Sequence, residues 1–526
     1  MLTRRQLLRA AGSVAGSALA PPLIGCAMPG PRWSKDPFSL GVASGEPLPD
    51  GFVLWTRLAP EPLSPDPATP GGMSGAAVPV TYEIAADPAM KAVLRRGTAL
   101  AEPDLAWSVH VEVPGLAPAR PYWYRFAAGS AQSPVGRAMT APLPGAALER
   151  LKFGFVSCAN YEIGYFSAYR HLAEEAPDFV VFLGDYIYEN FGRRPGVRRH
   201  SDGVAAHDLR TYRNRYAQYR TDPNLQRLHA DVSALMTWDD HEVQNDYADQ
   251  WSETFDDPAA FLKRRAAAYR AFYEHMPLRP SRSHPNGPNM RIYDRFAFGD
   301  LVEFFVLDGR QYRSREACYG PPDHGGGHQE TMTGCPELLD PRRTFLGFAQ
   351  ERWLYDGLAR SRARWNVIAQ DQLMAQFRER TGDGRIAYWT DDWNGYPEAR
   401  KRLLTHVRDA RVANPVVIGG DIHSFWANDL KLDFDDPRAP VVASEFVGTS
   451  ITSFGPPYDT FMQWVPDNPH VHFFESRRRG YVSVELQPER MSVAMRVVSD
   501  VADPKTTIAT LKNFVVESGR AGPLAA

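Results

Sequence analysis

Hydrophobic and polar positions along the chain change their period near residue 145. From residue 33 to 141, apolar side chains alternate with polar ones in short runs at 52–56, 80–84, 107–113 and 122–126, separated by turns rich in proline and glycine. A period of two is typical of β-strands that are buried on one face only. The first region is therefore predicted to be all-β.

The turn before the last of these runs carries a more specific signal. Residues 113–118 lead into Tyr122 in the manner of a tyrosine corner, in which the tyrosine hydroxyl bonds to backbone a few residues upstream. This pattern favours an immunoglobulin-like or fibronectin type III-like β-sandwich over residues 33–145, ending in the Pro-rich linker 141–145. We find no cluster of reactive side chains in this region.

After residue 149, apolar runs alternate with helical stretches. Continuous apolar runs, typical of strands buried on both faces, occur at 151–156, 179–183, 233–236, 301–307, 365–369, 416–418 and 441–446. Amphipathic patterns predict helices over 166–175, 258–275, 349–360 and 397–408. Alternation of strands and helices is typical of an α/β domain, which we assign to residues 149–526.

Composition and charge exclude several classes of protein. Of 526 residues, 44% are hydrophobic and 23% charged, which are globular proportions, so a disordered or fibrous chain is excluded. Lys and Arg number 59 against 62 Asp and Glu, for a net charge of −3. Because this balance provides no positive field for a phosphate backbone, we expect no nucleic-acid partner.

Residues 1–26 are typical of an export signal. Arg4 and Arg5 precede a mildly apolar stretch at 10–24, a pattern that indicates the twin-arginine route. Residues 23–26 resemble a lipobox with Cys26 as the lipidated residue, and the alternative cleavage site is Ala18-Leu19-Ala20. We expect a monomer in the periplasm or at the cell surface, exported by the twin-arginine machinery and attached to membrane only through the signal or a lipid.

The remaining cysteines fall into a pair and a single residue. Cys318 and Cys335 are 17 positions apart around a glycine-rich loop, and in an exported protein this spacing favours a disulfide bond. A zinc site with His324 and His328 is the alternative, although the spacing matches no tight ligand pattern. Cys158 is left without a cysteine partner.

Polar clusters follow four of the predicted buried strands, at 157–160, 184–189, 238–242 and 419–423. Since the carboxyl ends of strands in an α/β sheet meet at one edge, we expect these clusters to form one site. Phosphoester hydrolysis needs a Lewis acid and a nucleophile at working pH, and two adjacent cations supply both. Asp185 is the predicted bridge between two cations, with Asp421 and His423 arriving from the late strand.

Longer segments identify a family resemblance. Residues 38–47, 53–58, 307–313, 392–397, 468–471 and 479–481 are similar to the PhoD-type alkaline phosphatases, which include phospholipase D-like phosphodiesterases within the calcineurin-like metallophosphoesterases. The resemblance implies an α/β fold with a metallophosphoesterase-type β-sandwich core and flanking helices. It also implies hydrolysis of phosphate esters by a metal-activated hydroxide at an iron and calcium centre.

The same resemblance implies a ligand set for each ion. Fe³⁺ would be held by Cys158, Asp185, Tyr188 and His423, with Tyr186 as the competing phenol. Ca²⁺ would bind beside it through oxygen ligands, as that ion prefers. The calcium ligands carried over are Asp185, Asn245 and Asp421, and the alternatives to Asn245 are Asp240, Asp246 and Asn160.

His241 is the predicted phosphate-facing residue, or a residue behind the ligands, with Asp239 or Asp240 orienting its ring. A purely structural histidine is the alternative. Arg310 follows an apolar strand, and its planar fork suits phosphate oxygens. An ion pair of Arg310 with Asp308 or Glu303 is the simpler interpretation.

Three other functions are alternatives to a phosphatase. A phosphodiesterase or phospholipase D acting on phospholipids or teichoic-acid-like polymers would use the same metal centre. A catalytically inactive surface-binding protein is disfavoured, because all the ligand positions are retained together. A dinucleotide-dependent oxidoreductase is disfavoured, because no Gly-x-Gly-x-x-Gly follows the first α/β strand.

Overall fold

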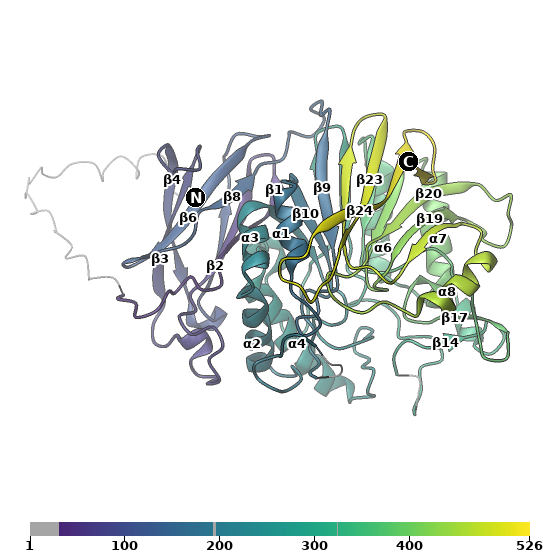
Figure 1. The fold of residues 1–526 in the computed structure, drawn as a ribbon, viewed down its shortest axis with the longest axis horizontal. Helices are drawn as coiled ribbons and strands as arrows, with labels where there is room; N and C mark the ends of the chain where they lie inside the picture. The colour runs from purple at the N-terminus through teal and green to yellow at the C-terminus, as the bar shows by residue number, and fades with distance from the viewer. Residues whose placement is uncertain (1–30, 193–195, 323–324) are drawn as a thin grey trace, which may run out of the picture.

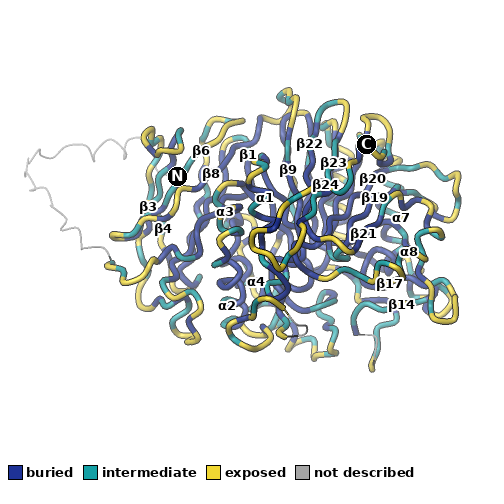
Figure 2. Tube along the Cα trace, in the orientation of Figure 1, coloured by how far each residue is buried: buried dark blue, intermediate teal, exposed yellow. Residues whose placement is uncertain are grey.

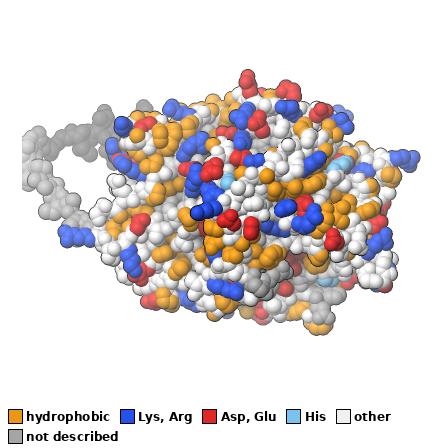
Figure 3. All heavy atoms as spheres, viewed as in Figure 1, with side chains coloured by type: hydrophobic (Ala, Val, Ile, Leu, Met, Phe, Trp, Pro, Cys, Tyr) orange, Lys and Arg blue, Asp and Glu red, His pale blue; other side chains and the backbone are white. Residues whose placement is uncertain are grey.

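The computed structural model describes residues 31–192, 196–322 and 325–526 (Figure 1). The predicted signal with Cys26 and its alternative cleavage site lies outside the described residues, as does His324. Within the described ranges, no helix combines the length and hydropathy that a bilayer span requires. Figure 3 shows basic and acidic side chains interspersed over the visible face, as the near-balanced charge predicts.

Two large β-sheets form the centre of the protein (Figure 1). The ten-stranded sheet has the order β25 (Leu524–Ala525), β24 (Ile508–Glu517), β23 (Arg490–Val498), β22 (Gly480–Leu486), β9 (Leu151–Val156), β10 (Phe179–Leu183), β11 (Ser233–Thr237), β1 (Val42–Leu48), β2 (Gly51–Arg57) and β5 (Ser108–Val113). The seven-stranded sheet has the order β12 (Asp294–Phe298), β13 (Val302–Val306), β15 (Trp365–Ala369), β18 (Pro415–Gly419), β20 (Val441–Val447), β19 (Phe425–Lys431) and β21 (Val471–Glu475).

Aromatic side chains join the two sheets. The ring of Phe153 on β9 meets Phe304 on β13 edge to face at 5.0 Å, and Phe179 on β10 stacks on Phe298 of β12 at 4.6 Å. All four side chains are buried in one hydrophobic cluster that spans both sheets, the dark blue centre of Figure 2. Strands with both faces covered read as continuous apolar runs, which is why the sequence pattern located β9, β10 and β13.

Helices cover the outer face of each sheet. The ten-stranded sheet packs against α1 (Ser167–Glu174), α2 (Leu209–Arg220), α3 (Pro223–Asp231) and α4 (Pro258–His275), and the seven-stranded sheet against α6 (Phe348–Arg360) and α7 (Pro397–Asp409). Of the remaining helices, α5 spans Pro280–Ser283 and α8 spans Tyr458–Trp464. These layers confirm the predicted α/β fold, and the predicted helix at 258–275 coincides with α4. The sequence pattern missed α2, because this helix buries Arg215 and Arg220.

The N-terminal region is all-β, as predicted. A separate five-stranded sheet faces β1, β2 and β5 across a shared hydrophobic cluster. It consists of β4 (Val93–Ala101), β3 (Val78–Ala85), β6 (Pro121–Ala128), β7 (Ala131–Gln132) and β8 (Gly136–Met139). The Tyr122 hydroxyl donates to the Ala117 carbonyl at 3.1 Å, which is the expected tyrosine corner. Because β1 also pairs in parallel with β11, through Gly45 and Ala234, one sheet runs from this region into the α/β region without a break.

A small three-stranded sheet lies near the disulfide loop. It consists of β14 (Gln329–Glu330), β17 (Ile386–Trp389) and β16 (Glu379–Arg380). Cys318 and Cys335 form a disulfide bond with a Cα–Cα distance of 6.0 Å. His328, from the zinc alternative, bonds through Nδ1 to the Gly326 carbonyl.

Replacing both bridged cysteines should lower stability without affecting the metal site. The disulfide closes a loop of 17 residues, so Cys318→Ser with Cys335→Ser should lower the free energy of unfolding by about 3 kcal/mol. Urea unfolding of oxidised and reduced protein measures this, and reduction should then have no further effect on the double variant. Metal loss without a stability change would contradict the structural role and favour zinc.

Candidate metal centre

The four predicted polar clusters meet at one end of the two sheets. Cys158 follows β9, Asp185 follows β10, Asp239 follows β11, and Asp421 follows β18 of the other sheet. Cys158, Asp185 and Asp421 all have positive φ, between 52° and 61°, which non-glycine residues rarely adopt. Such strain is typical of functional sites and persists because the surrounding structure fixes it.

Glu242 holds two of these strand-end loops together. Its buried carboxylate accepts hydrogen bonds from the backbone N–H groups of Asp185 at 3.1 Å, Tyr186 at 2.6 Å and Asp239 at 2.9 Å. The carboxylate thereby satisfies backbone donors that would otherwise be buried without partners. This arrangement fixes the spacing between Asp185 and Asp239.

Three groups of side chains have ligand atoms close enough to share an ion, and Asp185 belongs to all of them. Within each group the ligand atoms lie within 4.8 Å of one another. The groups are Cys158 with Asp185 and His423, Asp185 with Asp240 and His241, and Asp185 with Asp239, Asp240 and Asp421. Asp185 could therefore contribute a ligand atom to each group, and its bridging role stays a prediction.

Tyr188 joins the first of these groups. Its hydroxyl donates to Asp185 Oδ2 at 2.8 Å, lies 2.9 Å from His423 Nε2, and accepts from Ser453 Oγ at 2.7 Å. The competing phenol, Tyr186, instead contacts His229 Nε2 at 2.9 Å within the helical layer. Of the two tyrosines, the structure therefore brings Tyr188 to the cluster.

The buried acidic cluster fits bound cations. Asp185 Oδ1 and Asp239 Oδ2 are buried and accept no hydrogen bond from the described residues. Burial and the carboxylates of Asp239 and Asp240 raise the pKa values of Asp185 and Asp421 well above their usual range, and burial together with Asp185 and Asp421 raises that of the Cys158 thiol. Positive charge placed among them would stabilise their ionised, ligating forms.

His423 is oriented as a neutral ligand. Its Nδ1 bonds to the Phe454 carbonyl at 2.8 Å, which directs Nε2 toward Tyr188 and the cluster. Burial and the nearby Arg479 lower the pKa of His423 to about 3. Arg479, which the sequence analysis left without a role, also donates to the His423 carbonyl at 2.6 Å.

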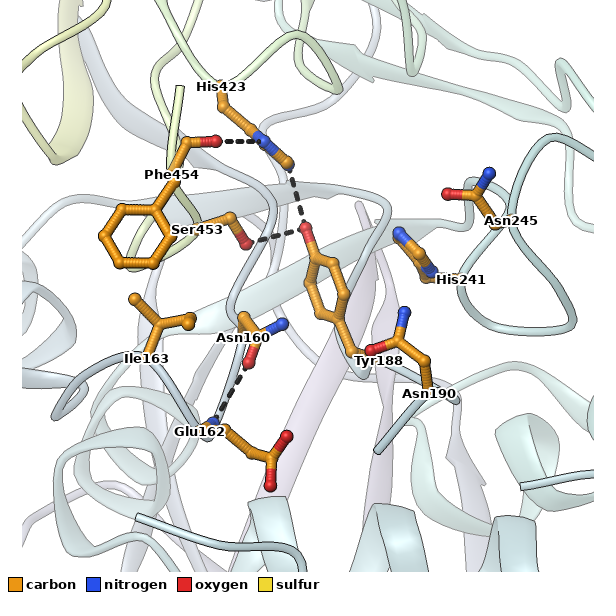
Figure 4. Close-up of a pocket in the computed structure, with 10 residues that line it drawn as sticks. All are labelled: Asn160, Glu162, Ile163, Tyr188, Asn190, His241, Asn245, His423, Ser453 and Phe454. Carbon is orange, nitrogen blue, oxygen red and sulfur yellow. Dashed lines mark hydrogen bonds between the residues drawn. The ribbon is translucent and has the colours of Figure 1, made fainter. Parts of the chain in front are cut away.

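His241 lies in the wall of a pocket of about 180 Å³ beside the cluster (Figure 4). Its Nδ1 pairs with Glu189 Oε2 at 2.6 Å, which leaves Nε2 as the free ring nitrogen. Burial opposes protonation, but Glu189 and Asp240 outweigh it and raise the pKa of His241 well above its usual value. Glu189, rather than Asp239 or Asp240, therefore orients the ring, which corrects the prediction for both aspartates.

The candidates for an oxygen-ligated ion separate into two sets. Asn245 and Asn160 line the His241 pocket, and in Figure 4 they lie on either side of the Tyr188 ring. Asp246 does not line this pocket and accepts from the Gly327 N–H at 2.8 Å. Asp240 accepts from the backbone N–H groups of His241 and Asp246. Asn245 thus shares a pocket with Tyr188 and His423.

Arg310 does not reach the pocket, so its predicted contact with phosphate is wrong. The side chain is fully buried, its Nε donates to Asp239 Oδ1 at 2.5 Å, and its Nη atoms bind both oxygens of Asp391 at 2.7 and 2.9 Å. The ion-pair interpretation holds, but with Asp239 and Asp391 as partners instead of Asp308 or Glu303. Asp308 Oδ1 accepts from the backbone N–H of Arg310, not from its guanidinium, and also from Trp238 Nε1 and the Gln311 N–H.

Sequence reasoning missed the roles of Glu189, Asp391 and Ser453. Glu189 ends the predicted cluster 184–189, so its position was visible although its contact with His241 was not. Asp391 precedes the family segment at 392–397, which is an indirect signal. Ser453 lies in a loop with no local signal, because its contact with Tyr188 depends on tertiary packing.

Comparisons with known proteins agree over nearly the whole chain. Residues 153–495 match the model of the PhoD-like phosphatase family, and residues 25–142 match the model of the N-terminal domain of that family. Alkaline phosphatase D of Bacillus subtilis (strain 168) is 43% identical over 531 residues, covering 99% of this chain and 88% of the relative. A solved structure of PhoD is 44% identical with a TM-score of 0.87, covering 94% of this chain and 93% of that one. This chain belongs to the PhoD-like phosphatase family.

Proposed function

We propose that this protein is a metal-dependent phosphohydrolase that hydrolyses phosphate esters at the Asp185 centre. The observation that carries the proposal is the position of Asp185, which belongs to three potential ligand groups and keeps a buried oxygen that has no hydrogen-bond partner among the described residues. A pocket lined by His241, Tyr188 and His423 opens beside it. The relationship to alkaline phosphatase D supports the same activity.

The ligand types support an assignment of Fe³⁺ and Ca²⁺. A thiolate, a phenolate, a carboxylate and an imidazole, from Cys158, Tyr188, Asp185 and His423, suit a transition metal such as iron. Carboxylate and amide oxygens from Asp185, Asn245 and Asp421 suit calcium. Bound cations supply charge that neutralises phosphate oxygens and lowers the pKa of water.

The protein's own residues orient the substrate. Glu189 holds the His241 ring so that Nε2 is available to donate to a phosphate oxygen in the pocket. Ser453 fixes the Tyr188 hydroxyl, and the Phe454 carbonyl fixes the His423 ring. Arg310 does not line the substrate pocket. It supports the site indirectly, because its ion pairs neutralise Asp239 and Asp391.

We also propose export by the twin-arginine route to the periplasm or cell surface. The support is Arg4 and Arg5 ahead of the apolar stretch 10–24. The intact mass of the exported protein distinguishes a lipidated Cys26 from cleavage after Ala20. A mass that retains residue 1 would contradict both processing sites.

Elemental analysis of the natively exported protein tests the metal proposal. We expect iron near one per chain and calcium at one or two, with hydrolysis of p-nitrophenyl phosphate that is lost with a chelator and restored by both ions. Zinc alone, or hydrolysis that survives complete metal removal, would contradict it. A metal-free protein without hydrolysis would favour the binding-protein alternative.

Tyr186 and Tyr188, two positions apart, provide a matched pair of variants for the proposed iron site. Tyr188→Phe and Cys158→Ser should each reduce bound iron at least about tenfold and bleach any phenolate or thiolate colour, because each removes a proposed ligand. Tyr186→Phe removes a phenol that contacts His229 and should leave iron and colour unchanged. Equal effects of both tyrosine variants would contradict the assignment.

Replacing Arg310 should destabilise the fold through its buried partners. Arg310→Met leaves Asp239 and Asp391 buried without this cation and should lower the free energy of unfolding by about 3 to 5 kcal/mol, measured by urea unfolding. Arg352→Met, on the exposed side of α6, is the control. The opposite outcome is an Arg310→Lys enzyme that is as stable as the wild type but is no longer inhibited by inorganic phosphate. That result would mean that Arg310 contacts phosphate after all.

A further inference from the structure

A second and larger pocket adjoins the metal centre. It has a volume of about 560 Å³ and shares Asn245, Asp421 and His423 with the centre already described. Its other wall is largely aromatic, formed by side chains that the proposed hydrolysis does not use: Phe377, Trp389, Phe461 and Trp464. An ester held at the metal centre would therefore have room for an organic group on this side.

The small three-stranded sheet directs three side chains into this pocket. Gln329 on β14 pairs with Trp389 on β17, and Glu379 on β16 pairs with Ala387, two residues before Trp389. Because side chains two positions apart on a strand share a face, Gln329, Trp389 and Glu379 lie on the same face. Gln329 Nε2 donates to Glu379 Oε2 at 2.6 Å, as this register requires.

The aromatic wall continues from this sheet to α8. Phe377, two residues before Glu379, stacks on Phe461 of α8 with ring centroids 5.5 Å apart. Trp464 at the end of α8 packs against Phe461 at 5.1 Å. Trp389 is 37% exposed, so its ring surface is available to a ligand.

Glu379 is a buried carboxylate without a cationic partner among the described residues. It is only 6% exposed, and burial raises its pKa to about 7. Its sequence neighbours Arg378 and Arg380 alternate to the other face, where they pair with Asp435 and Asp467. None of the described residues that line the pocket is Lys or Arg.

Burial of a carboxylate among aromatic rings points to a positively charged ligand. Aromatic faces attract organic cations, and an aromatic cage with an acidic residue is the usual recognition site for alkylammonium groups. We propose that the second pocket binds the ammonium-bearing organic group of a phosphodiester, with Glu379 as its counter-ion and Trp389 and Phe461 as its walls. This inference rests on the proposed phosphohydrolase function and names a substrate class for it.

A matched pair of substrates tests the proposal. p-Nitrophenyl phosphocholine and p-nitrophenyl 3,3-dimethylbutyl phosphate have the same leaving group and shape, but only the first carries a positive charge. We expect wild-type kcat/KM to be about tenfold higher for the cationic ester. A wild-type ratio near one would overturn cation recognition and leave at most an apolar subsite.

Variants assign the preference to named residues. Glu379→Gln is isosteric and should bring the ratio toward one, whereas Asp383→Asn, in the exposed turn of the same sheet, should leave it unchanged. Trp389→Ala should lower kcat/KM for both diesters about tenfold. Inhibition by inorganic phosphate, which has no organic group, should be the same in every variant. An unchanged ratio in Glu379→Gln would overturn the counter-ion assignment.

Failure of this proposal is distinguishable from failure of the phosphohydrolase function. Hydrolysis of p-nitrophenyl phosphate without hydrolysis of either diester would overturn the second pocket alone. No hydrolysis of any ester by the metal-loaded enzyme would contradict the proposed function. In that case calorimetry with choline phosphate and 3,3-dimethylbutyl phosphate still tests the pocket, and equal affinities would overturn it.

Discussion

The burial of several carboxylates at one point is the constraint on which the rest of the site depends. One carboxylate oxygen from each of Asp185, Asp239 and Asp240 lies within 4.8 Å of the others, at the ends of β10 and β11. These side chains are buried, so water does not screen the repulsion between their charges. Arg310 compensates part of this charge from behind the site. Asp185 Oδ1 and Asp239 Oδ2 have no hydrogen-bond partner among the described residues, and bound cations would stabilise these carboxylates. The acidic cluster therefore suits ion binding at some expense of stability.

The two packed sheets make this arrangement possible. The ends of β9, β10 and β11 come from one sheet and the end of β18 from the other, so ligands far apart in sequence meet where the layers meet. Glu242 fixes the first loops by accepting three backbone hydrogen bonds. Positive φ angles at Cys158, Asp185 and Asp421 show that the backbone accepts local strain at these three strand ends, and such strain persists only where the surrounding structure fixes it.

The two pockets divide the proposed recognition of substrate. The smaller pocket, with His241 and Tyr188, is polar and suits a phosphate group. The larger one, with Trp389 and Glu379, is aromatic and acidic and suits an organic cation. His423 lines both, so the two pockets adjoin as the proposed binding of a single diester requires. The family relationship gives the chemistry of the first pocket, whereas the inference for the second comes from the register of the small sheet.

The sequence alone located seven buried strands of the α/β region, the helix at 258–275 and the clusters after the strands, because hydrophobic period and strand-end chemistry are local properties. It did not predict the buried strands β19 and β22. It missed α2, whose buried Arg215 disrupts the apolar period, and the continuous sheet through β1, whose pairing joins Gly45 to Ala234. Only tertiary structure decided that Glu189 orients His241 and that Arg310 is enclosed by Asp239 and Asp391. Those contacts join residues 52 to 81 positions apart, and packing of the layers sets their distances.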